Sequence, residues 1–255
     1  MNPTLSADVK FIRGETELAA KAYLEAAREG DVRASFNYGY CLWRGIGVPY
    51  NPAEAKSFFA YARDMEGGEA CYNLAMLYMH GEGVKRDYGT AVKYMKIAAE
   101  RGCIEAQLYL GMAYTTGCVF EPDIIGICMI PYHKPIYRDI YAPLLMGEVE
   151  DAELDEELRF AAISADARAA FEWFRRAAHH DPTYVSSLVA KGQFLYAKCY
   201  VDGMGTEFDR TKGYRLMLAA GKSGSAEAVN FLAENGITPA MLLGEGRSGK
   251  RGGTR

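Results

Sequence analysis

The chain has 255 residues, a formal net charge of −4 at pH 7 and 49% hydrophobic residues. This slightly acidic balance gives no general attraction to nucleic acid or to an anionic membrane, so neither is an expected partner. No apolar run approaches the ~18 residues of a membrane-spanning helix, and residues 1–20 lack the basic start and apolar core of a secretion signal. We therefore expect a cytoplasmic protein without a membrane span.

The sequence repeats itself, because Ala34, Ala70 and Ala106 open similar segments at intervals of 36 residues. The clearest copy, residues 70–106, holds an apolar stretch, a Gly-x-Gly loop and a second apolar stretch that closes on paired alanines. A fixed period of this length is the signature of a repeat architecture. The copies start near residues 34, 70, 106 and 192.

The copies are preceded, interrupted and followed by other segments. Residues 17–34 resemble the second half of a unit, and residues 228–236 resemble a first half. The third copy is broken by an insertion over residues 124–165, after which its second half resumes at Asp166. Residues 244–255 form a basic, glycine-rich tail that we expect to be flexible.

Each copy predicts two helices joined by a tight loop, because apolar residues recur at three- and four-residue spacing on both sides of the glycines. The first glycine lies where a helix ends, and its left-handed conformation lets the chain turn. A short oxygen-bearing side chain lies where the next helix begins, and it caps free amide groups there. These glycines are Gly45, Gly81, Gly117 and Gly203, and the capping residues are Asn51, Asp87, Asp166 and Asp209. The predicted fold is all-α, a stack of helical hairpins.

This pattern resembles the Sel-one-like repeat, a relative of the tetratricopeptide repeat, over most of residues 17–236. The third copy departs from it, with Cys118, Val119 and Phe120 where a second glycine and a valine are due. The resemblance implies a right-handed α/α superhelical solenoid in one domain, residues 1–243. It also implies an adaptor that assembles other proteins.

The tetratricopeptide resemblance further implies a concave wall built from the first helices, on which certain repeat positions are exposed. Most residues at these positions are large and apolar, and they would suit an amphipathic helix or an extended peptide of a partner. The alternative is that they pack between hairpins. Asn37 and Asn73 share a position near which peptide-binding tetratricopeptide proteins use an asparagine to bond the ligand backbone. The candidate groove residues are Phe36, Asn37, Tyr40, Trp43, Tyr72, Asn73, Met76, Met79, Leu108, Met112, Phe194 and Lys198.

The insertion over 124–165 has an apolar, aromatic first part and an acidic second part. It is either a loop folded back on the solenoid or a lid or docking arm for a partner. If the chain is instead an enzyme or a small-ligand binder, its pocket is expected between the insertion and the solenoid wall. The side chains for that alternative are Tyr132, His133, Tyr137 and Arg138.

Catalytic motifs are poor in this sequence. Residues 244–251 nearly spell a phosphate-binding loop, but Arg251 stands where serine or threonine should bind magnesium. No cofactor and no metal are expected. No pair of cysteines recurs in every copy of the repeat, so we expect free and mostly buried thiols. The predicted function is a non-catalytic protein–protein interaction scaffold.

Overall fold

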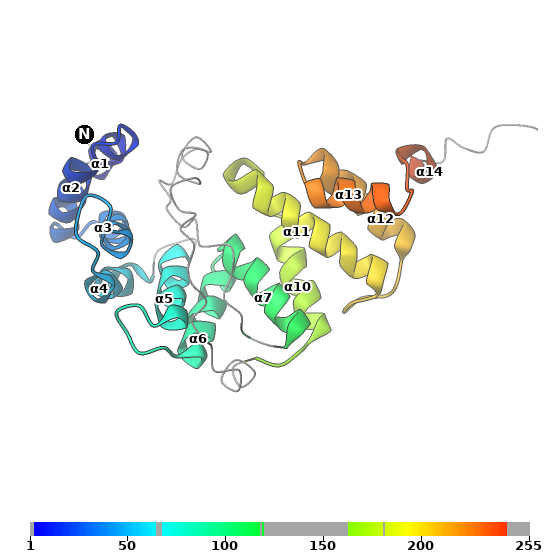
Figure 1. The fold of residues 1–255 in the computed structure, drawn as a ribbon, viewed down its shortest axis with the longest axis horizontal. Helices are drawn as coiled ribbons and strands as arrows, with labels where there is room; N and C mark the ends of the chain where they lie inside the picture. Colours follow the sequence, from blue (N-terminus) through cyan, green and yellow to red (C-terminus); the bar gives the residue numbers. More distant parts are fainter. Residues whose placement is uncertain (1–2, 65–67, 118, 120–162, 181, 244–255) are drawn as a thin grey trace, which may run out of the picture. The chain divides into compact units, whose positions relative to one another are not determined.

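The computed structural model describes residues 3–64, 68–117, 119, 163–180 and 182–243. Every regular element in these ranges is a helix, which confirms the all-α prediction. The chain forms two compact units, Met1–Ala165 and Asp166–Arg255. Figure 1 colours the helices in chain order.

The first unit is a series of helices in which each packs on the next one in the sequence. Helices α3 and α4 form the first hairpin, helices α5 and α6 form the second, and α7 opens the third. Nearest-neighbour packing of this kind is what a stack of repeats requires. The helices of this unit are α1 (Pro3–Ile12), α2 (Thr16–Arg28), α3 (Val32–Arg44), α4 (Pro52–Ala62), α5 (Glu69–His80), α6 (Tyr88–Glu100) and α7 (Ile104–Thr116).

Helix α1 is a feature that the repeat pattern did not predict. It precedes the lone half repeat and packs on α2, with Ala7 and Phe11 buried. Its Asp8 is also buried and accepts a hydrogen bond from the Tyr23 hydroxyl of α2 at 2.7 Å. Helix α1 therefore covers the start of the stack, as a terminal capping element of a solenoid does.

The second unit continues the same pattern of neighbouring helices. Helix α11 has 21 residues and begins ten residues before Gly192, where the fourth copy starts. The core between α11, α12 and α13 contains Ala197, Val201, Met217 and Leu232. The helices of this unit are α10 (Ala167–Ala178), α11 (Pro182–Asp202), α12 (Arg210–Lys222), α13 (Ala226–Glu234) and α14 (Pro239–Leu243).

The four predicted helix caps are confirmed. The side chains of Asn51, Asp87, Asp166 and Asp209 each accept a hydrogen bond from the backbone N–H three residues later, at 3.2, 3.0, 3.0 and 2.9 Å. Each bond satisfies one of the amides that the first turn of a helix leaves without a partner. The second helix of every hairpin therefore begins at the same repeat position.

The loop glycines do more than turn the chain. Gly83 has a φ of +66°, and a Cβ there would lie 2.4 Å from the backbone nitrogen of Ala53, in the first turn of α4. The equivalent Gly47 and Gly205 approach the first turns of α2 and α10 in the same way, with 2.2 and 2.0 Å to the nearest backbone atom. The second glycine thus lets the backbone of one hairpin touch the backbone of the hairpin before it.

The cysteines that the structure describes are buried thiols, namely Cys41, Cys71, Cys103 and Cys199. Burial raises the pKa of Cys41 to about 12, so this thiol is a poor nucleophile. The expectation of buried thiols is confirmed for these four; Cys118 and Cys128 lie outside the described residues.

The glycine contact predicts different costs for two otherwise similar substitutions. Gly83→Ala places a methyl group against the backbone of α4, so it should destabilise the first unit by roughly 2–4 kcal/mol. Gly14→Ala is the control, because Gly14 also has a positive φ but a methyl group there would have no other atom within 4 Å, and it should cost only about 1 kcal/mol. Denaturant unfolding of both variants measures the difference. If both variants lose the same unfolding free energy, the close contact between Gly83 and α4 does not contribute to stability.

Candidate functional site

The sequence predicts an exposed groove wall of twelve residues, and the structure buries most of them. Those of α3, α5 and the start of α7 are at most 2% exposed, namely Phe36, Asn37, Tyr40, Trp43, Tyr72, Asn73, Met76, Met79 and Leu108. The remaining three, Met112, Phe194 and Lys198, are half-buried. The exposure expected of the nine is therefore not found.

Several candidate groove residues are buried because their aromatic rings pack against a neighbouring helix. The rings of Phe36 and Trp43 lie 5.8 and 5.9 Å from the ring of Phe59 in α4, so both face their own hairpin partner. In the second unit, Phe194 packs on Phe231 of α13, at 6.1 Å between ring centroids, and Lys198 pairs with Asp202 of its own helix. Packing between helices, the alternative left open by the sequence, accounts for Phe36, Trp43 and Phe194.

The two asparagines at the shared repeat position differ in their partners. Asn37 donates from Nδ2 to the carboxylate of Asp8 in α1, at 3.3 Å. Asn73 is fully buried, and neither its Oδ1 nor its Nδ2 has a hydrogen-bond partner among the described residues. Leaving a buried polar group without a partner costs about 1–3 kcal/mol, so Asn73 is an exception to the packing of this unit that demands a reason.

A carboxyl group lies one helical turn before Asn73. Glu69 is in the first turn of α5, four residues earlier, so both side chains leave the same face of the helix. Its Oε2 is shielded from solvent and has no partner among the described residues. Burial, and secondarily the nearby carboxylate of Glu105 in α7, raises the pKa of Glu69 to about 7. Asn73 and Glu69 thus place buried polar atoms on one face of α5.

Sequence reasoning identified Asn73 but missed Glu69. The signal was present in the repeat, because Glu69 stands at the position of Arg33, one residue before the alanine that opens a copy. Arg33 pairs with Asp8 at 2.5 Å, whereas Glu69 faces another carboxylate. That carboxylate belongs to Glu105, which stands at the same position of the third copy.

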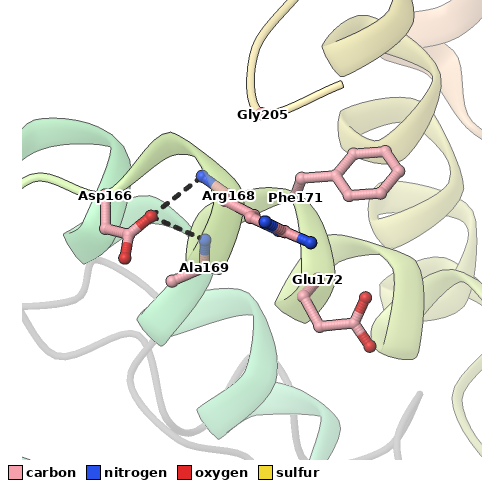
Figure 2. A pocket seen from close by; sticks show the side chains of 6 residues that line it. All are labelled: Asp166, Arg168, Ala169, Phe171, Glu172 and Gly205. Carbon is pink, nitrogen blue, oxygen red and sulfur yellow. Dashed lines mark hydrogen bonds between the residues drawn. The ribbon is translucent and has the colours of Figure 1, made fainter. Parts of the chain in front are cut away.

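The second unit contains a surface pocket of about 760 Å³, lined by Asp166, Arg168, Ala169, Phe171, Glu172 and Gly205 (Figure 2). Both carboxylates are engaged. Asp166 accepts from the backbone nitrogens of Arg168 and Ala169, at 3.0 Å each, and Glu172 pairs with Arg175 at 2.5 Å. Asp166 therefore caps the N-terminus of α10, and Glu172 forms an ion pair on the surface of the same helix.

Several candidate features lie outside the described residues. They include the insertion side chains Tyr132, His133, Tyr137 and Arg138 and the tail over 244–255. In the part that the structure describes, no cluster of three histidine, cysteine or acidic side chains is arranged to hold a metal ion. Within the same part, no helix is long and apolar enough to cross a bilayer. A cytoplasmic location and the lack of a nucleic-acid partner stay predictions.

The unpaired amide of Asn73 gives a stability prediction with a matched control. Asn73→Leu replaces an unsatisfied amide by an apolar group of similar size, so it should raise the unfolding free energy of the first unit by about 1–3 kcal/mol. Asn37→Leu, the same change at the same repeat position, removes a donor from Asp8 and should lower it by a similar amount. Denaturation midpoints report both. If Asn73→Leu is as destabilising as Asn37→Leu, an internal water satisfies the amide.

The raised pKa of Glu69 predicts how stability depends on pH. The folded protein favours the protonated acid, so this contribution is complete below the ordinary pKa of 4.5 and is lost as the pH rises through about 7. Glu69→Gln should therefore stabilise the protein at pH 8, on the order of 2 kcal/mol, and change little at pH 4. Glu100→Gln, at an exposed position of α6, is the control and should show no such difference. Parallel pH profiles for wild type and Glu69→Gln would contradict the assignment.

The comparisons with known proteins agree with this architecture. The Sel1 repeat family model matches residues 32–66, 68–103, 104–123, 160–182 and 190–225. No matched segment covers residues 124–159, so the matches stop where the predicted insertion begins and resume at residue 160, before its predicted end at residue 165. These segments together cover more than half of the chain.

Individual relatives are more distant. Chitin synthase regulatory factor 3 of Schizosaccharomyces pombe is 24% identical over 185 residues, which is 69% of this chain and 19% of that protein. The chain thus spans about a fifth of the length of the curated relative it matches.

Two solved structures share the fold. A Sel1 repeat protein from Oxalobacter formigenes has a TM-score of 0.66 at 19% identity, covering 92% of this chain and 78% of that one. The protective antigen c5321 of uropathogenic Escherichia coli has a TM-score of 0.64 at 20% identity, covering 95% of this chain and 44% of that one. With its repeats, caps and loop glycines in phase, the chain belongs to the Sel1 repeat family.

Proposed function

We propose that this protein is a non-catalytic scaffold that holds a peptide or protein partner against the first helices of its first unit. The observation that carries the proposal is the buried amide of Asn73, which has no partner among the described residues. An amide carries donors and an acceptor, which is the complement of a peptide group. The main chain of an extended partner segment therefore satisfies both of its ends at once.

The surroundings of Asn73 suit this role. Tyr72, Met76 and Met79 lie on the same helix, and methionine side chains adapt to ligands of different shape. Asn73 is fully buried, so a partner reaches it only when neighbouring side chains move. Once the partner is in place, exclusion of water strengthens the hydrogen bonds to the amide.

The comparisons support a scaffold at the level of the family. The relative in fission yeast is named a regulatory factor, which is consistent with a protein that acts through another protein. The shared fold offers a stack of hairpins, an architecture that provides extended binding surfaces. The insertion over 124–165 is a second proposed contact surface, and an enzymatic or small-ligand site there is the alternative function.

The test compares partner capture by three forms of the full chain. Affinity capture from the native lysate, with cross-linking and quantitative mass spectrometry, should recover a partner with wild type and lose it at least about tenfold with Asn73→Leu. The control is Asn230→Leu, which adds a leucine to the exposed face of α13 and should capture as wild type does. Because Asn73→Leu is expected to be the more stable protein, lost capture cannot be attributed to unfolding. Undiminished capture by Asn73→Leu would refute the proposed site.

A further inference from the structure

An arginine lies against an aromatic platform at the end of α3. Arg44 is the last residue of this helix, and its guanidinium carbon lies 4.2 Å from the centroid of the Trp43 ring and 5.9 Å from that of Tyr40. The indole is fixed on two sides, because its N–H donates to the carboxylate of Glu82 and its ring packs edge-on against Phe59. Arg44 is thus held by a cation–π contact to a ring that cannot easily move.

One edge of this guanidinium has nothing to bind. The Nε and Nη2 atoms of Arg44 are shielded from solvent and have no hydrogen-bond partner among the described residues. These two nitrogens direct their N–H groups to the same side of the guanidinium. That side is one of the edges with which arginine binds a carboxylate through two parallel hydrogen bonds.

The acid beside the platform is already engaged. Glu82 accepts the N–H of the Trp43 indole. Tyr50 lies near both charges, since burial first and then Glu82 raise the pKa of its phenol while Arg44 lowers it. Tyr50 itself is 58% exposed.

We propose that the Nε–Nη2 edge of Arg44 is an anchoring site for one carboxylate of the partner. This rests on the proposed function, because the carboxylate belongs to the protein or peptide that the first unit holds. A singly charged carboxylate fits better than a phosphate, which carries up to two negative charges and needs more donors than one guanidinium edge beside Glu82 supplies. The bond from Trp43 to Glu82 joins the end of α3 to the loop after α5, so the anchor lies where the first two repeats meet.

Trp43 provides a direct probe of this anchor. The chain has two tryptophans, so Trp173→Phe leaves Trp43 as the sole source of indole emission. The full chain in this background is titrated with three tetrapeptides. The first is blocked at both ends and carries one glutamate, and the second is the matching glutamine peptide. The third has uncharged side chains, a blocked N-terminus and a free C-terminal carboxylate. The glutamate peptide, the free-carboxylate peptide or both should change the emission saturably, with half-saturation at or below about 1 mM. The peptide that acts identifies the source of the carboxylate.

The control variant is Arg44→Lys. It keeps a positive charge beside the indole but lacks the paired N–H edge, so the response should weaken at least about tenfold while the circular dichroism spectrum stays that of the parent. An equal response to the glutamine peptide, an undiminished response in Arg44→Lys, or a stronger response to inorganic phosphate than to acetate would each overturn the proposal. So would no response at all.

The two proposals fail separately. If Asn73→Leu loses the captured partner while Arg44→Lys retains it fully, the carboxylate anchor is refuted and the scaffold function stands. If the carboxylate peptides bind at Arg44 but Asn73→Leu captures as wild type does, the anchor stands and the main-chain site at Asn73 is refuted.

Discussion

The stack depends on one contact, in which the second loop glycine of a hairpin approaches the first turn of the second helix of the preceding repeat. A methyl group at Gly47, Gly83 or Gly205 would lie 2.0–2.4 Å from a backbone atom, so the main chain sets the spacing between neighbouring hairpins. The third copy carries Val119 at this position instead of a glycine. It is also the copy in which the sequence adds the insertion over 124–165.

Close stacking explains why the candidate groove residues are buried. When backbones touch, the space between first helices is filled by side chains such as Tyr72 and Met76, each 1% exposed. A polar side chain at such a position must find a partner inside the protein or remain unsatisfied. Asn37 finds Asp8 because α1 lies beside it, and Asn73 has no equivalent neighbour among the described helices.

The sequence predicted the features that depend on local chemistry. Caps such as Asp87 and loop glycines such as Gly81 act within a few residues of themselves, so their position in the repeat was sufficient. Burial could not be predicted in the same way, because Trp43 is covered by Phe59 of another helix. The pairing of Asn37 depends on α1, which lies outside the repeats, and the unpaired edge of Arg44 is visible only when every neighbour has been placed.

In a repeat protein, the contacts of a residue can be compared with those of the residues at the same position in the other copies. This comparison shows which residues stabilise the stack and which need another explanation. A position that recurs with the same contacts, such as the cap at Asn51 and Asp87, serves the stack. A position where the residue recurs but its partner does not, such as Asn73, is unexplained by the stack, and this is the basis for proposing a ligand there. Because α1 supplies the acid that satisfies Asn37 in the first copy, it is the second copy, and not the first, that keeps a buried amide without a partner among the described residues.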